Sequence, residues 1–178
     1  MKYFAYFFLL ALVMNSCVNP FAPGLSENEL NALSILTQQR SPEDVLTNFR
    51  YAYTFKDSLI YSDLLDSSFI FISKNYSNSP PTDIIWGRDV DIKTTVGLFR
   101  HYNVLELNWG AILSQPIDYK PDSLLVAEIK IIFNLTFDGG IEIPTIKGEA
   151  LFNFRKKYFG SDSTGIWLIT RWEDLSSF

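Results

Sequence analysis

The sequence predicts an α+β domain, with helices in its N-terminal half and antiparallel strands in its C-terminal half. Three observations lead to this prediction. Helix-start signals cluster before residue 60. Apolar and polar residues alternate with period two over Leu124–Asp138, as in an antiparallel strand with one buried face. Asp138-Gly139-Gly140 then supplies the positive φ angles of a tight hairpin. A chain of 178 residues fits one domain.

Capping signals predict the first two helices. Residues 26–29 form a capping box, in which a serine oxygen and a glutamate carboxylate satisfy free backbone amides, so a short helix is expected over 26–38. Ser41-Pro42 places a cap residue before a proline at the first helical position. Apolar residues at helical spacing then extend this second helix to about Lys56.

Hydrophobic periodicity predicts the elements that follow. We expect a short helix over 58–65, a strand over 68–73, a loop over 75–82 and a long helix that ends near His101. Asp89 or Asp91 is the expected cap of that long helix.

The C-terminal part is predicted to be a meander of four strands. These are Val104–Ser114, Leu124–Asp138, Ile141–Tyr158 and Gly165–Glu173. Pro144 cannot donate to a ladder, so we expect it at an edge or a bulge. Strict alternation in the last strand places Trp167 and Arg171 on one face and Trp172 on the other.

The N-terminus has the layout of a secretory signal: one lysine, a short apolar core, a small residue and Cys17, the chain's single cysteine. It resembles a bacterial lipoprotein signal peptide. The resemblance implies a signal peptide over 1–16, a lipidated tether over 17–25 and one domain over 26–178. Cys17 would then carry a diacylglycerol and an acyl chain such as palmitate, enough for stable membrane anchoring. The alternative is an ordinary signal peptide with an incidental cysteine.

The lipoprotein resemblance also implies a location. Val18, rather than aspartate, follows the cysteine. The expected place is the bacterial cell envelope, lipid-anchored at the outer membrane and facing the periplasm or the cell surface.

The order of elements resembles the nuclear transport factor 2-like superfamily, also called SnoaL-like or ketosteroid-isomerase-like. Ser41–Phe49 with Tyr61–Phe69 looks like its opening helix leading into the first strand, and Gly165–Leu175 looks like its closing strand. The resemblance implies a cone, in which a curved antiparallel sheet wraps around about three N-terminal helices. It supports the fold better than any function.

Enzymes of this superfamily use a carboxylate base and hydrogen-bond donors in the cone. The candidates here are Asp63, Asp66 and His101, each with a structural alternative. Both aspartates suit a turn between helix and strand, and a histidine in the last turn of a helix interacts favourably with the helix dipole. We therefore expect no catalytic residue, no metal site and no cofactor.

Aromatic residues, 16% of the chain, offer the better binding argument. The candidate ligand-binding residues are Tyr53, Trp86, Trp109, Trp167 and Arg171. Each has a structural alternative, either core packing or, for the arginine, an ion pair.

Three functions remain open. The first is a non-catalytic envelope lipoprotein whose cone binds a small apolar ligand or a protein partner. The second is an isomerase- or dehydratase-like enzyme, and the third is a structural role as a homodimer through the sheet face. A net charge of −5 with scattered basic residues excludes a nucleic-acid partner.

Overall fold

The structure, a computed structural model, describes residues 36–119, 125–138, 145–158 and 164–176, without the side chains of 117–119. Residues Ile35–Phe178 form one compact unit. Its elements in chain order are α3 (Pro42–Phe55), α4 (Ser58–Leu64), β1 (Leu65–Asn75), β2 (Thr82–Gly87), α5 (Arg88–His101), β3 (Leu105–Ser114), β4 (Ile117–Tyr119), β5 (Leu125–Phe137), β6 (Ile146–Lys157) and β7 (Ile166–Asp174).

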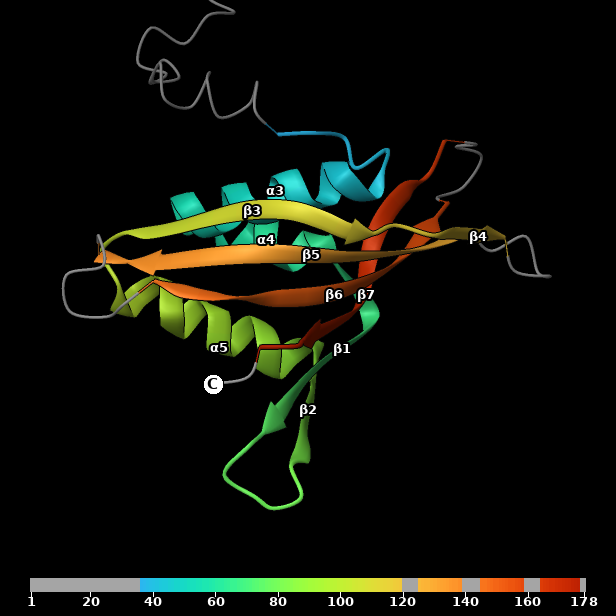
Figure 1. The fold of residues 1–178 in the computed structure, drawn as a ribbon. Coiled ribbons are helices and arrows are strands. Elements are labelled where there is room, and N and C mark those ends of the chain that lie inside the picture. The colour runs from blue at the N-terminus through green and yellow to red at the C-terminus, as the bar shows by residue number, and fades with distance from the viewer. Residues whose placement is uncertain (1–35, 120–124, 139–144, 159–163, 177–178) are drawn as a thin grey trace, which may run out of the picture. The chain divides into compact units, whose positions relative to one another are not determined.

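The strands form one curved, open sheet in the order β2-β1-β7-β6-β5-β3, with the short β4 also paired to β5. The pairs among β3, β5, β6 and β7 are antiparallel, which confirms the predicted meander. Only the β1–β7 pair among the described strands is parallel. The three helices lie against one face of this sheet (Figure 1), so the predicted α+β cone is confirmed.

Local signals read from the sequence set the helix boundaries. Ser41 Oγ accepts a hydrogen bond from the Asp44 amide at 3.2 Å, and the Asp44 carboxylate accepts one from the Ser41 amide at 3.3 Å. This reciprocal pair is a capping box, and Pro42 occupies the first helical position. Lys56 ends the helix with a left-handed φ of 56°. The predicted second helix is therefore confirmed at both ends.

Two strands and one cap differ from the sequence prediction. The expected loop over 75–82 leads into β2, an exposed strand that pairs with β1, and β4 was not expected. Because β2 runs directly into α5, Gly87 takes the N-cap position. Asp89 and Asp91 lie in the first turn, where acids favour the helix dipole without capping it.

The predicted strict alternation in the last strand is wrong because β7 contains a bulge. Ile169 pairs with Phe154, whereas Arg171 pairs with Asn153, so one extra residue lies in β7 between these pairs. Trp172 therefore joins Trp167 on the core side, and Arg171 lies on the other face.

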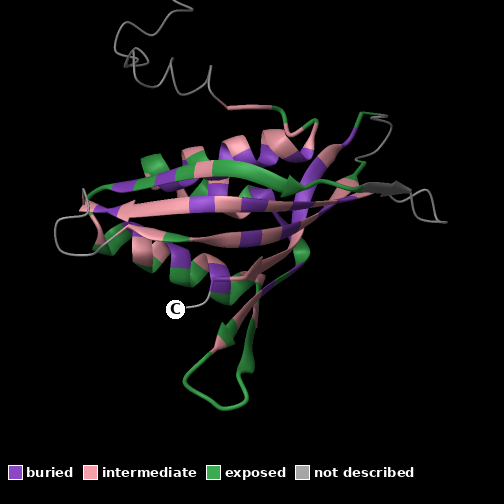
Figure 2. Ribbon diagram, in the orientation of Figure 1, coloured by how far each residue is buried: buried purple, intermediate pink, exposed green. Residues whose placement is uncertain are grey.

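Aromatic rings fill the middle of the cone. Phe49 of α3 lies at ring-centroid distances between 4.9 and 5.7 Å from five other rings, those of Tyr53, Tyr61, Trp109, Phe152 and Trp172. The inward residues of β5 and β6 are buried, and buried and less buried positions alternate along these strands (Figure 2). The centre of the cone is therefore packed with side chains, as protein interiors usually are.

Several predictions lie outside the described residues. These are the signal peptide, Cys17, the tether, most of the helix over 26–38, the hairpin glycines and Pro144. Residues 36–38 are described and are not helical, so the predicted helix does not extend to its expected end. Within the described ranges, no helix is both long and apolar enough to cross a bilayer.

Candidate functional site

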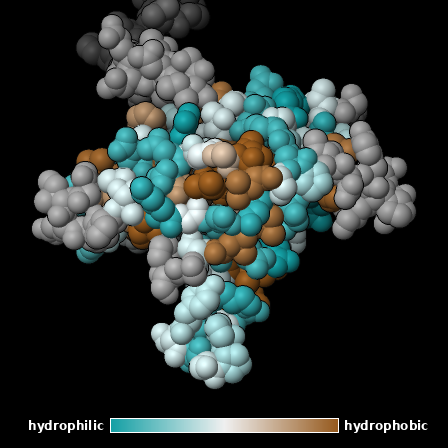
Figure 3. Space-filling view, viewed as in Figure 1, coloured by the Kyte–Doolittle hydropathy of each residue, from teal (hydrophilic) through white to brown (hydrophobic). Residues whose placement is uncertain are grey.

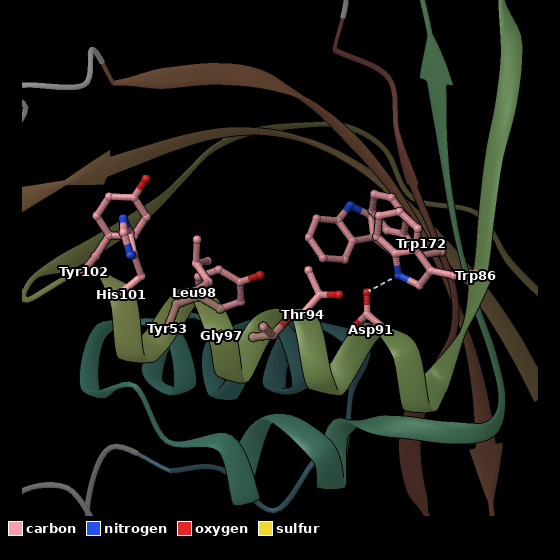
Figure 4. Close-up of a pocket in the computed structure, with 11 residues that line it drawn as sticks. Tyr53, Trp86, Asp91, Thr94, Gly97, Leu98, His101, Tyr102 and Trp172 are labelled. Atoms are coloured by element: carbon pink, nitrogen blue, oxygen red, sulfur yellow. Dashed lines mark hydrogen bonds between the residues drawn. The ribbon is translucent and has the colours of Figure 1, made fainter.

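A cavity of about 460 Å³ lies beside α5, next to the filled centre of the cone. The close-up in Figure 4 shows side chains of α5 facing Trp86 of β2 and Trp172 of β7. Two helices, α3 and α5, and three strands, β1, β2 and β7, contribute the lining. It consists of Tyr53, Phe71, Trp86, Asp91, Thr94, Thr95, Gly97, Leu98, His101, Tyr102 and Trp172. It is the most apolar of the large hollows among the described residues.

Helical spacing explains why α5 supplies so much of this lining. Asp91, Thr94, Thr95, Leu98 and His101 recur at intervals of three and four residues and therefore share one side of the helix. Asp91 lies in the first turn and His101 in the last. At 1.5 Å rise per residue, about 15 Å of helix separates them.

Asp91 is the buried acid of the cavity, with 3% of its surface exposed. Its Oδ1 accepts a hydrogen bond from Trp86 Nε1 at 2.9 Å, and its Oδ2 accepts one from the Tyr61 hydroxyl at 2.5 Å. Burial raises the pKa of the Asp91 carboxyl above its ordinary value, although these two hydrogen bonds oppose the rise. The Asp91 carboxyl therefore keeps its proton to a higher pH than an ordinary aspartate does.

Two tyrosine hydroxyls lie near Asp91: Tyr53 lines the cavity, whereas Tyr61 is fully buried behind the carboxyl group. Burial, together with the neighbouring Asp91 charge, raises the pKa of both Tyr53 and Tyr61, so both phenols stay protonated and can donate hydrogen bonds. Thr95 contributes a further hydroxyl beside them. Asp91, Tyr53 and Thr95 thus give the mainly apolar cavity a small polar part, and Tyr61 supports it from behind.

Three aromatic residues make the wall nearest to Asp91. Phe71 stacks on Trp86 at a ring-centroid distance of 4.3 Å and an interplanar angle of 20°. Trp172 meets Phe71 edge-on at 4.9 Å and 84°. The wall thus has rings in two nearly perpendicular orientations beside one carboxyl group.

The predicted ligand-binding residues are divided by the structure. Tyr53 and Trp86 line the cavity. Trp109 instead packs against Phe49 and donates its indole N–H to the Leu46 carbonyl at 2.9 Å. Trp167 is 3% exposed and belongs to the core.

Arg171 lies away from the cavity, on the other side of β7. Its Nη2 pairs with Glu173 at 2.5 Å, which is the ion-pair alternative weighed from the sequence. It borders a separate, more polar hollow of about 500 Å³ with Glu128 and Asn153.

The candidate acid–base residues are also separated. Asp63 is exposed on α4 and does not line the cavity. Asp66 is buried and accepts hydrogen bonds from Ser68 and from Arg155 Nη2, the latter at 2.5 Å. Burial alone raises the pKa of Asp66, but the hydrogen bonds from Ser68 and the neighbouring cations outweigh it and lower that pKa.

Of the three acid–base candidates, only His101 lines the cavity, where it stands at the far end from Asp91 (Figure 4). From the sequence, Asp91 was expected only as a helix cap, and its place in the cavity was not identified. The sequence signal that could have placed Asp91 in the cavity was its helical spacing from His101 in α5. In the described part of the chain, no group of three or more His, Cys, Asp or Glu side chains is arranged to hold a metal ion.

No protein-family model matches the sequence, and no curated protein matches it significantly. Solved structures do resemble it. A conserved protein from Planctomyces limnophilus shares 14% identity with a TM-score of 0.53, covering 74% of this chain and 89% of that one. A nuclear transport factor 2-like protein of unknown function from Pseudomonas putida shares 8% identity with a TM-score of 0.53, covering 87% and 91%.

A third similar structure is a protein with a cystatin-like fold from Caulobacter vibrioides, at 10% identity and a TM-score of 0.50, covering 74% of this chain and 84% of that one. At these identities the likeness establishes the fold alone. The chain has a nuclear transport factor 2-like fold with an aromatic cavity that contains one buried carboxyl group.

Proposed function

We propose that this protein binds a small, mainly apolar ligand in the cavity beside α5, without transforming it. The observation that carries the proposal is the cavity itself: about 460 Å³, walled by aromatic and aliphatic side chains, with a few convergent polar groups. Ligand sites in proteins usually have this composition and fall within this range of volumes.

The spacing of Asp91 and His101 favours binding over catalysis by these two groups. General acid–base catalysis needs groups within hydrogen-bond reach of one reacting centre. Asp91 and His101 lie about 15 Å apart along α5, because ten residues of helix separate them. A small ligand cannot place one reacting centre beside both.

A glycine in α5 provides a sharp test. Gly97 lines the cavity between Thr94 and His101, and a Cβ added there meets nothing within 4 Å. The Cβ of Gly97→Phe therefore meets no neighbour, and we expect its ring to fill part of the cavity. Gly97→Ala is the matched control, since it adds helix propensity and little volume.

The measurement is fluorescence titration with N-phenyl-1-naphthylamine, a neutral apolar probe. We expect saturable binding to the wild type and to Gly97→Ala, and a loss of about tenfold or more in affinity for Gly97→Phe, equivalent to about 1.4 kcal/mol. Equal affinity of all three proteins would show that the probe binds elsewhere and would refute the proposed site.

The second candidate function is an isomerase- or dehydratase-like reaction with Asp91 as the base. It is favoured by one observation, the buried carboxyl whose pKa burial raises, beside the Tyr61 hydroxyl. Turnover of a carbonyl or hydroxylated substrate that Asp91→Asn abolishes and Asp63→Asn preserves would establish it. Turnover unaffected by Asp91→Asn would exclude it.

The proposal also includes the protein's location. The N-terminal sequence supports a lipid anchor at Cys17 in the bacterial envelope, with the domain in the periplasm or at the cell surface. The homodimer predicted through the sheet face also stays a prediction. The face seen in Figure 3 carries an apolar patch over β3 and β5, and Ile112 and Leu113 of β3 are exposed.

A further inference from the structure

The charges around the cavity are unbalanced. Asp91 is the one acidic residue in the described lining. No lysine or arginine is part of the described lining. The nearest arginine in sequence, Arg88, donates instead to the carbonyls of Ser62 and Leu65.

The Asp91 carboxylate has hydrogen bonds but no counter-ion among the described residues. Its partners are a tyrosine hydroxyl and an indole N–H, both neutral donors. Each oxygen accepts one hydrogen bond and keeps a further lone-pair site. A buried carboxylate is costly unless a cation pairs with it. A cation that entered the cavity would therefore find an unpaired negative charge at its end.

The aromatic wall next to Asp91 also favours a positively charged ligand group. The faces of indole and benzene rings carry negative potential and attract ammonium groups within about 6 Å. Trp86 lies beside the carboxylate, because its own N–H is bonded to Asp91. In the same wall, Phe71 stacks on Trp86 and meets Trp172 edge-on.

We propose that the ligand is a primary amine, whose ammonium group binds Asp91 between the rings of Trp86 and Trp172 and whose apolar body lies along α5 toward His101. This inference rests on the proposed function and names the chemical class of its ligand. The ammonium donates to the free lone pairs of Asp91 and balances its charge. The distance from Asp91 to His101, about 15 Å of helix, limits the length of the body.

Three probes of similar shape and different charge test the inference. They are 2-phenylethylamine, which is a cation at pH 7, 2-phenylethanol, which is neutral, and phenylacetate, which is an anion. Their affinities for the purified protein are measured by calorimetry and by ligand-observed NMR at the same ionic strength. We expect the amine to bind about tenfold more tightly than the alcohol, a difference of about 1.4 kcal/mol. Phenylacetate should bind most weakly.

Two asparagine variants test whether the preference for the amine depends on Asp91. Asp91→Asn keeps the shape of the side chain and removes its charge, so the amine should lose its advantage over the alcohol while the alcohol still binds. Asp89→Asn is the matched control, because Asp89 is exposed in the same helical turn and does not line the cavity. It should leave the ratio unchanged.

The outcomes separate this inference from the proposed function. Binding of the alcohol with equal or weaker binding of the amine overturns the amine inference and preserves the ligand site. An amine preference that survives in Asp91→Asn also overturns it. Absence of saturable binding for all three probes overturns both proposals. If Asp91→Asn does not fold, the ranking of the three probes on the wild type still decides.

Discussion

Replacing Asp91 with asparagine should stabilise the folded protein at neutral pH. The carboxylate is buried without a counter-ion, and burial raises its pKa, so its charged form is disfavoured in the fold. Asparagine can still bond to both neighbours: its oxygen accepts from Trp86 as before, and its amide donates to the Tyr61 hydroxyl, which reverses the direction of that second bond. The charge is lost while the hydrogen bonds remain. We expect a gain of about 1 kcal/mol, because the cost of desolvating an unpaired charge is removed.

The sign of the pH dependence follows from the raised pKa. The folded state binds the Asp91 proton more tightly than the unfolded state, so the destabilising effect of the charge is present above the folded-state pKa. It disappears as pH falls toward 3.8, the ordinary value. The other titratable groups facing Asp91 are Tyr53 and Tyr61, whose pKa values are raised, with His101 at the far end of α5. Neither tyrosine titrates in this acidic range.

The assay is thermal and urea unfolding of the wild type and Asp91→Asn from pH 4 to pH 8. A gain of 1 kcal/mol corresponds to an increase in Tm of about 2–4 °C in a domain of this size. The increase should be present at pH 7–8 and shrink toward pH 4. A variant less stable than the wild type at pH 7, or a difference that does not change with pH, would contradict an unpaired, desolvated carboxylate.

Three further predictions concern other parts of the chain. Trp167→Ala should cost about 3–5 kcal/mol in urea unfolding, because it removes a large side chain from the core, and it should leave probe affinity unchanged. Arg155→Ala should cost about 1–2 kcal/mol because it removes a hydrogen-bond partner of buried Asp66. Because the pKa of Asp66 is lowered, that loss should be full at pH 7 and should fade as acid protonates the carboxyl; a loss that persists at low pH would refute this cause. Cys17→Ala should move the protein from the membrane fraction to the soluble fraction, and a variant that stays wholly with membranes would exclude the lipid anchor.

Local signals made much of the fold predictable. The cap at Ser41, the proline after it and the period of two in β5 each depend on neighbouring residues, and the structure confirms all three. β2 gave no such signal, because its residues are mostly exposed and it is held by backbone pairing to β1. The bulge in β7 was also invisible, since only its pairing with β6 reveals the extra residue.

The candidate site was predictable only in part. Tyr53 and Trp86 were proposed as ligand-binding residues from their aromatic character, and both line the cavity. The place of Asp91 depends on Tyr61, 30 residues earlier in the chain, and on the docking of β2 beside α5. Such tertiary contacts leave no periodic pattern in the sequence. The same contacts give Asp91 its burial and its raised pKa.

The most direct test of the cavity is to see where a ligand binds. In ¹H–¹⁵N NMR spectra of the protein titrated with 2-phenylethanol, each tryptophan side-chain N–H gives its own signal. We predict that saturation shifts the Trp86 and Trp172 indole signals and the backbone amides of the α5 residues that line the cavity, Thr94, Thr95, Gly97, Leu98 and His101. The indole signal of Trp167, in the core, should stay in place. Shifts confined to the exposed residues of β3, with Trp86 and α5 unaffected, would contradict the account.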